Sequence, residues 1–273
     1  MARIITNKAF SLIELLVVVT IIALLVSILL PSLNRAKQEV KNVNCQSNVR
    51  QLGLANFGYA LENEGRLVPA AKDIHLSHNG HHRWHGYREH ANDPFYPLRG
   101  PLASYLADGE VNQCPSFTEF YTGPVQSESY EKGNGGYGYN LVYLGSQNWK
   151  PGLYMAQANA RTTMLEEIGS PAGTLMFADT AILHQVSGVT RTIEYSFTQA
   201  PYHLINGEIV ISLMPQPSLH FRHEGRNNIT WADGHVTDED IASDESLVAM
   251  NVTEPEYQLG WFEPMDNSRF DLK

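Results

Sequence analysis

The sequence has few charged residues, and basic residues are the scarcer kind. Charged side chains make up 18% of the 273 residues, with 19 Lys and Arg against 29 Asp and Glu and a net charge of −10. Together with 43% hydrophobic residues, this composition excludes a chain that is disordered throughout and a charged coiled coil. The negative excess opposes long-range attraction to phosphate, so no nucleic acid partner is expected.

Cysteines and long hydrophobic runs are also scarce. A mean hydropathy of −0.25, with the apolar excess at one end, excludes a protein with several membrane spans. The two cysteines, Cys45 and Cys114, cannot form a framework of several disulfides. They could form one disulfide if the protein is exported, and the alternative is two buried thiols.

The one long apolar run covers residues 10–30 and is interrupted by a single acid. A helix of this length reaches about 30 Å, the thickness of the hydrocarbon core of a bilayer. Arg3 and Lys8 precede the run and no acid does, so the N-terminus is expected in the cytoplasm and the rest of the chain beyond the membrane. The length of the run and the lack of a small-residue cleavage site argue against a removed secretory signal.

Glu14 lies near the start of this run. Holding a carboxylate in lipid costs at least about 2 kcal/mol, and a plain anchor gains nothing from it. The acid therefore favours a helix that is both membrane anchor and assembly element, in which Glu14 meets a partner of opposite charge.

The segment KAFSLIELLVVVTIIALLVSILLP resembles the N-terminal processing motif of type IV prepilins and of the pseudopilins of type II secretion. In that family, prepilin peptidase cuts before a Phe and methylates the new amino group, leaving an acid at the fifth mature position. The resemblance places the cut between Ala9 and Phe10 and makes Glu14 the fifth residue. The family usually has Gly before the cut, where this chain has Ala9. The Phe10 ammonium of one subunit would then meet Glu14 of its neighbour in a low-dielectric helix bundle.

The helical pattern continues beyond Pro31, which is expected to bend the helix without ending it. The rod should end near residues 63–65, and its outer half should pack on the following domain. The predicted continuous face has apolar or small residues at spacings of three and four, namely Leu33, Ala36, Val40, Val43, Ser47, Leu54, Phe57 and Leu61.

From residue 65 onward, short β-branched runs separated by Gly and Pro predict a β-rich domain. The expected strands are 174–178, 189–197, 208–214, 228–232 and 235–237, with a tight turn at Asp233-Gly234 and a short capped helix at 237–250. The sequence thus predicts an α+β protein whose long N-terminal helix packs on a pilin-like head. Its predicted parts are a leader (1–9), a transmembrane helix (10–30), an amphipathic helix (31–64) and a β-rich head (65–273).

A second resemblance lies in RHEGRNNITWADGHV, where His223, Asp233 and Gly234 fit the H-x9-DG signature at the C-terminal end of a group of large prepilin-like proteins. Further matches to this group are NVRQLGLA after Cys45, Cys114-Pro115, GYGYN ending at Asn140, and TLMFADT. The resemblance implies a pseudopilin-like subunit.

Two groups of residues could bind a divalent metal ion. His223, Asp233 and His235, with Asp179, offer suitable ligands, although His223 and Asp233 could equally be a hydrogen-bonded strut and a turn residue. The stretch 75–90 holds six histidines, of which His78, His82 and His85 would share a helix face suited to zinc. Its glycines argue against a helix, and the alternative is an exposed, pH-responsive loop.

No nucleophile elbow, P-loop, HExxH or dinucleotide motif is present, so an enzyme is not indicated. The predicted function is a structural pilin-like subunit of a type II secretion or type IV pilus-like fibre, anchored by one span in the inner membrane with a periplasmic or extracellular head. Its expected partners are prepilin peptidase and other pilin-like subunits. The alternative is a membrane-tethered extracytoplasmic binding module that does not polymerise.

Overall fold

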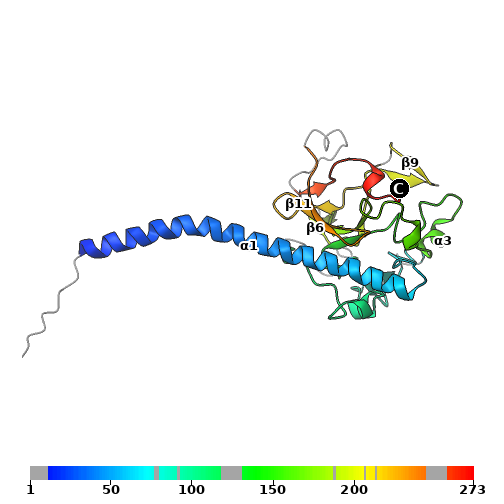
Figure 1. Ribbon diagram of the computed structural model, residues 1–273, viewed down its shortest axis with the longest axis horizontal. Helices are drawn as coiled ribbons and strands as arrows, with labels where there is room; N and C mark the ends of the chain where they lie inside the picture. The colour runs from blue at the N-terminus through cyan, green and yellow to red at the C-terminus, as the bar shows by residue number, and fades with distance from the viewer. Residues whose placement is uncertain are drawn as a thin grey trace, which may run out of the picture. The chain divides into compact units, whose positions relative to one another are not determined.

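A long N-terminal helix precedes a β-rich region, which confirms the predicted α+β architecture (Figure 1). This computed structural model describes residues 12–76, 80–90, 93–117, 131–186, 189–205, 207–212, 214–243 and 257–273. The chain divides into two compact units, one up to Lys41 and the other from Asn42 to Lys273.

The first unit consists, in its described part, of the N-terminal turns of helix α1 (Leu12–Glu62). Helix α1 continues through Pro31, as predicted, and it is long and apolar enough to cross a membrane. The side chains of residues 12–40 are exposed, yet the hydroxyls among them have partners within the helix. Thr20, Ser27 and Ser32 each donate a hydrogen bond of 2.7–2.8 Å to the carbonyl three residues earlier. Such internal pairing is what a hydrocarbon environment requires of polar groups.

In the second unit, the C-terminal turns of α1 pack on a sheet, but not through the predicted face. Val43, Leu54 and Leu61 are 53%, 55% and 82% exposed. The buried face instead consists of Asn42, Cys45, Val49, Leu52, Gly53, Ala55, Asn56 and Ala60. Of the predicted face, Phe57 is partly buried against the core. Hydrophobic spacing selected a neighbouring face because the true one combines Val49 and Leu52 with small residues and amides.

The amides on this buried face are hydrogen-bonded. Asn56 Nδ2 lies 3.2 Å from the Tyr139 hydroxyl, and Asn56 Oδ1 accepts a hydrogen bond of 2.8 Å from the Val68 amide. Asn42 Oδ1 accepts a hydrogen bond of 2.8 Å from the side chain of Asn228. Because these groups find partners across the interface, their burial does not carry the full cost of desolvation.

The central sheet has five strands in the order β12-β11-β4-β3-β7. Strands β12, β11, β4 and β3 pair antiparallel, and β7 pairs parallel with β3. The bounds are β3 (Tyr137–Asn140), β4 (Leu175–Asp179), β7 (Phe197–Thr198), β11 (Arg226–Trp231) and β12 (Val236–Asp240). Strands β3 and β4 are buried along their whole length, which explains the continuous apolar run of β4.

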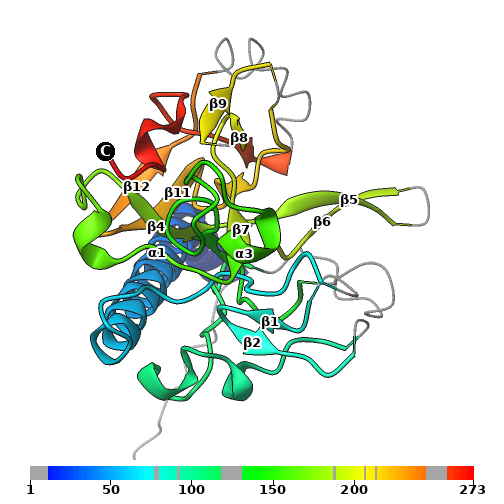
Figure 2. The same ribbon diagram turned by 90° about the vertical axis from the view of Figure 1, so that its right-hand side faces the viewer.

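In the described part of the chain, four two-stranded sheets accompany the central one. They are β1 (His82–Arg83) with β2 (Gly86–Tyr87), β5 (Ile182–Val186) with β6 (Val189–Ile193), β8 (His203–Ile205) with β9 (Glu208–Val210), and β10 (Leu219–His220) with β13 (Leu259–Gly260). Strands β5 and β6 extend from the rest of this unit as an arm (Figure 2). The short helices are α3 (Met155–Asn159), η2 (Pro97–Arg99), η3 (Ala103–Tyr105), η4 (Leu165–Glu167) and η6 (Asn267–Arg269).

The predicted strands 174–178, 228–232 and 235–237 correspond to β4, β11 and β12. The predicted strand 189–197 is wrong as a single element, because β6 and β7 belong to different sheets. The predicted strand 208–214 ends earlier, at Val210. The predicted helix 237–250 is wrong at its start, where pairing with β11 extends β12 to Asp240. Residues 244–250 of that segment lie outside the described residues.

The predicted hairpin at Asp233-Gly234 is confirmed, with a longer turn than expected. The Gly234 amide donates to the Trp231 carbonyl at 2.9 Å, so the central turn residues are Ala232 and Asp233. Gly234 follows in the left-handed region at φ +89, and the Trp231 amide closes the loop on the His235 carbonyl at 3.0 Å. A turn followed by a left-handed glycine is the usual three-residue hairpin connection.

Close packing of α1 on β11 makes Gly53 sensitive to a single added carbon. A Cβ at Gly53 would lie 2.6 Å from Thr230 Cγ2. We expect Gly53→Ala to lower the free energy of unfolding by about 1–3 kcal/mol, although alanine favours a helix by about 1 kcal/mol over glycine. Urea unfolding of the full chain in detergent, followed by tryptophan fluorescence, measures the change.

The matched control is the same substitution in a Thr230→Ser background, which removes the clashing methyl group. There Gly53→Ala should be neutral or stabilising. A loss of stability as large as that in the wild-type background would refute steric contact with Thr230 as the cause.

Candidate functional site

The predicted processing residues Ala9 and Phe10 lie outside the described residues. The predicted assembly residue Glu14 lies in the first turn of α1 as described. The apolar side chains next to it in the chain, Ile13 and Leu15, are 72% and 51% exposed. Glu14 is thus placed in the apolar part of the helix that a membrane or neighbouring helices would surround.

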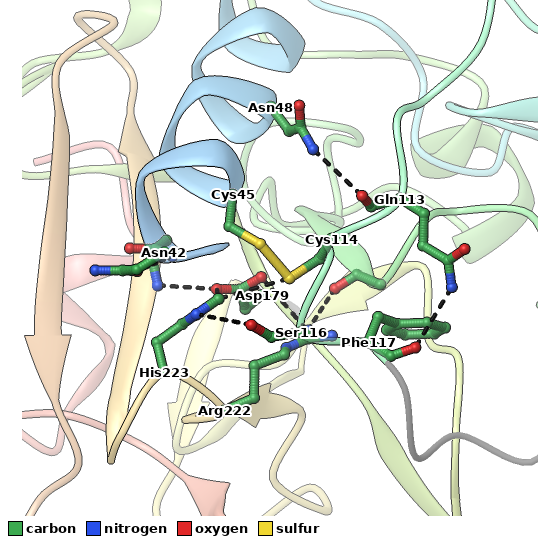
Figure 3. The surroundings of a disulfide bond; sticks show 12 residues. Asn42, Cys45, Asn48, Gln113, Cys114, Ser116, Phe117, Asp179, Arg222 and His223 are labelled. Atoms are coloured by element: carbon green, nitrogen blue, oxygen red, sulfur yellow. Dashed lines mark hydrogen bonds and ion pairs between the residues drawn. A yellow bond between two sulfur atoms is a disulfide. The ribbon is translucent and has the colours of Figure 1, made fainter. Parts of the chain in front are cut away.

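Cys45 of α1 and Cys114 form a disulfide with Cα atoms 5.2 Å apart (Figure 3). Both residues are fully buried or nearly so, at 0% and 1% exposed. The amide of Cys114 donates to the Gly135 carbonyl at 3.0 Å, which ties its loop to the segment before β3. Asn48, one turn after Cys45, donates to the Gln113 carbonyl at 3.4 Å. The disulfide therefore joins the C-terminal turns of α1 to a loop 69 residues further along the chain.

His223 and Asp179 meet beside this disulfide, at 3.2 Å between Nε2 and Oδ2. Asp179 is the last residue of β4, and a two-residue turn places His223 just before β11. The turn residues Glu224 and Gly225 have φ of 56 and 86, and His223 and Arg226 exchange both backbone hydrogen bonds at 3.2 Å. This geometry, a type I′ turn, brings His223 onto Asp179.

Arg222 compensates the charge of Asp179 in the interior. Its Nη2 lies 3.5 Å from Asp179 Oδ1, and both side chains are at most 3% exposed. Burial raises the pKa of Asp179, but Arg222, His223 and the Asn228 amide outweigh it and hold that pKa below its ordinary value. The carboxylate is therefore ionised: Arg222 forms an ion pair with Oδ1, and the Asn228 amide donates a hydrogen bond of 3.1 Å to Oδ2. Arg222 also donates to the carbonyls of Gly136 and Thr180, at 2.6 and 3.1 Å.

Of the four residues predicted as a metal or structural site, the structure brings together His223 and Asp179. Asp233 and His235 form a separate, exposed pair at the hairpin, with 2.5 Å between Oδ1 and Nδ1. The group of ligand-type side chains in the described chain is instead Cys45, Cys114, Asp179 and His223. Sequence reasoning missed that the two cysteines lie at this site, and also missed Arg222, although it directly precedes His223.

The histidine-rich stretch 75–90 does not form the zinc-binding helix face considered from the sequence. Strands β1 and β2 occupy its second half, and His78 lies outside the described residues. The alternative prediction, an exposed loop, is also wrong at His85. This side chain is 2% exposed, and its Nε2 lies 2.8 Å from Ser196 Oγ. Burial, together with the charge of Arg83, lowers the pKa of His85 well below its ordinary value. His82 contacts Asp73, at 2.8 Å.

Comparison with known families matches residues 6–30 to the prokaryotic N-terminal methylation motif. This match supports a prepilin-like protein that prepilin peptidase processes and that assembles with pilin-like subunits. The apolar helix α1 is compatible with the membrane anchor of such a protein. No curated protein and no solved structure matches the chain.

The disulfide should make a large contribution to the stability of the second unit. Closing a loop of 69 residues lowers the entropy of the unfolded chain by an amount worth about 4 kcal/mol. We expect the double variant Cys45→Ser, Cys114→Ser to lose stability of this order in urea unfolding with a metal chelator present. The reduced wild-type chain with chelator is the matched control and should show the same loss. A loss below about 1 kcal/mol in both would contradict the prediction.

Glu194, between β6 and β7, makes a contribution to stability that falls as pH rises. Its Oε2 accepts a hydrogen bond of 3.2 Å from the Gly133 amide, and burial raises its pKa to about 7. The folded state therefore binds this proton more tightly than the unfolded chain, whose value is about 4.5. As the pH rises from about 4.5 to about 7, this contribution to the free energy of unfolding should fall by up to about 3 kcal/mol.

Urea unfolding of the full chain at pH 5 and pH 8 checks this dependence. Glu194→Gln should raise the stability at pH 8 relative to that at pH 5 by up to about 3 kcal/mol compared with the wild type. The buried His85 and His220, whose pKa values are lowered, contribute in the opposite direction in both proteins. Glu208→Gln, at an exposed position in β9, should leave the wild-type difference unchanged. The same pH dependence in Glu194→Gln as in the wild type would show that another group causes it.

Proposed function

We propose that this protein is a structural, non-catalytic pilin-like subunit, a pseudopilin of a type II secretion system or a subunit of a type IV pilus-like fibre. Prepilin peptidase removes residues 1–9 and methylates Phe10, and α1 anchors the subunit by a single span in the inner membrane. The N-terminus starts on the cytoplasmic side and the head lies in the periplasm or beyond. The disulfide supports this placement of the head, since disulfides persist in oxidising compartments.

The observation that carries the proposal is the methylation motif at residues 6–30, continued by an apolar helix with one acid in its first described turn. A carboxylate costs at least about 2 kcal/mol in lipid. An ammonium at Phe10 of a neighbouring subunit would offset this cost in a bundle of helices. The apolar side chains of residues 12–30 would then pack against those of other subunits.

A groove in the head favours the second candidate function, a tethered binding module that does not polymerise. The groove has a volume of about 340 Å³ and is lined mainly by apolar side chains, among them Leu141, Met155 and Leu204. Grooves of this size and character can bind small molecules or peptide segments. A tethered binding module should be a monomer in membranes, whereas a fibre subunit should form higher assemblies. A measurement of assembly therefore distinguishes the two candidate functions.

Mass spectrometry of the N-terminal peptide tests the processing step. The chain is expressed in full with and without a prepilin peptidase and extracted from membranes. The expected result with the peptidase is a chain that begins at N-methylated Phe10, even though Ala9 replaces the usual Gly. A chain that still begins at Met1 in both samples would overturn the proposed processing.

Glu14→Ala should reduce assembly at least about tenfold and leave membrane insertion unchanged, because the ion pair and not the apolar surface is removed. Assembly is measured by cross-linking and sedimentation of membrane-extracted material. Glu39→Ala, at an exposed acid of the same helix beyond the apolar run, is the matched control and should assemble normally. Normal assembly of Glu14→Ala would favour the binding module or another mode of polymerisation.

A further inference from the structure

Four side chains of the kinds that bind transition metals converge in the interior of the head. They come from four separate segments: α1, the loop of Cys114, the end of β4 and the turn before β11. One ligand atom from each of Cys45, Cys114, Asp179 and His223 lies within 4.8 Å of all the others. None of the four residues is more than 4% exposed. Figure 3 shows the disulfide, the carboxylate and the imidazole facing one another.

The spacing of these atoms suits a tetrahedral ion once the two sulfurs separate. Zinc bonds of 2.0–2.3 Å to nitrogen, oxygen and sulfur place neighbouring ligand atoms about 3.3–3.8 Å apart. His223 Nε2 is 3.2 Å from Asp179 Oδ2 and 3.6 Å from Cys114 Sγ. The Cα atoms of the cysteines are 5.2 Å apart, and rotation about the Cα–Cβ bonds after reduction would move the sulfurs apart.

Neighbouring groups hold the ligands in the orientation that a metal ion needs. Ser116 Oγ lies 3.5 Å from His223 Nδ1, on the far side of the ring from the other ligands. Arg222 Nη2 lies 3.5 Å from Asp179 Oδ1, and the Asn228 amide donates a hydrogen bond of 3.1 Å to Asp179 Oδ2. Outer partners of this kind fix the ring nitrogen and the carboxylate oxygen that face a bound ion.

Charge balance favours one metal ion in the reduced state and none in the oxidised state. With the disulfide formed, the Asp179 carboxylate and the Arg222 guanidinium compensate each other. With two thiolates present, three negative charges face Arg222 alone, and a divalent cation brings the buried site to neutrality. Uncompensated charges in the interior are costly, so the thiolate form and the divalent ion stabilise each other.

We propose that the reduced protein binds one Zn²⁺ through Cys45, Cys114, Asp179 and His223, and that oxidation of the two cysteines to the disulfide releases the ion. A thiol–disulfide oxidant RSSR takes two electrons from the two thiolates. One S–S bond forms in the protein, the RS–SR bond breaks, two protons from solvent complete two RSH, and Zn²⁺ leaves. The sulfurs select zinc over calcium, which prefers oxygen ligands.

In both states, the same residues connect α1 to the loop of Cys114, either covalently or through the ion. The head would therefore keep this connection before the disulfide forms, and release zinc when it does. All four ligands belong to the second unit, so zinc binding does not depend on assembly into a fibre.

Zinc content of the wild-type full chain in detergent, in its two redox states, tests the proposal without any substitution. One portion is reduced with a phosphine under nitrogen and the other is kept oxidised, and both are loaded with zinc sulfate and desalted. Elemental analysis should find about one zinc per reduced chain and less than about a tenth of that per oxidised chain. Oxidised glutathione added to the loaded reduced chain should release one zinc for each two thiols lost. No zinc in the reduced chain, or equal zinc in both states, would overturn the proposal.

Substitutions identify the ligands. Asp179→Asn and His223→Gln, reduced, should weaken zinc binding at least about 100-fold, and Co²⁺ in the wild-type site should give a thiolate charge-transfer band and tetrahedral absorption. Asp233→Asn and His235→Gln, at the exposed pair, are the matched controls and should bind zinc as the wild type does. Unfolding midpoints of the oxidised variants identify any that do not fold, and for those the wild-type redox comparison decides. Folded ligand variants with unchanged affinity would refute this ligand set.

Discussion

The link between Cys45 and Cys114 is the constraint on which the second unit depends most. It joins the C-terminal turns of α1 to a loop 69 residues further along the chain. Around it, amides of α1 bond to the sheet, as Asn42 does to Asn228 and Asn56 to Tyr139. Gly53 completes the contact by allowing the helix backbone to approach Thr230. The helix is thereby positioned by specific short contacts as well as by hydrophobic area.

In the described part of the head, two buried acids are compensated by buried arginines. Asp179 lies with Arg222, and Arg83 lies 2.6 Å from Glu131 with both side chains at most 2% exposed. The Arg83 guanidinium also lies over the ring of Phe95, at 4.9 Å. Removal of one member of such a pair leaves a charge without compensation, which is far more costly than replacing the pair as a whole. These pairs therefore select one arrangement of the loops around the sheet.

The sequence predicted those features that depend on local pattern. The run around Phe177 predicted a strand, Asp233-Gly234 predicted a hairpin, and the apolar run with Glu14 predicted a membrane-type helix with a processing motif. Prediction from the sequence failed where the structure depends on contacts between residues far apart in the chain. The face of α1 that is buried holds Asn42, Gly53 and Asn56, and their burial is understandable only once Asn228, Thr230 and Tyr139 are placed opposite them.

The candidate site shows the same division. The signature containing His223 was visible in the sequence, whereas its approach to Asp179 depends on a type I′ turn and on the register of two strands. Both cysteines were identified, but their position beside these residues was not predictable, because it depends on the packing of four segments.

Strand β12 lies at one edge of the central sheet and carries consecutive acids, Asp238, Glu239 and Asp240. An open sheet edge tends to recruit a strand from another molecule, and a row of like charges discourages this. The other edge strand, β7, has only two residues. Heads held close together at high local concentration would therefore resist merging into a continuous intermolecular sheet.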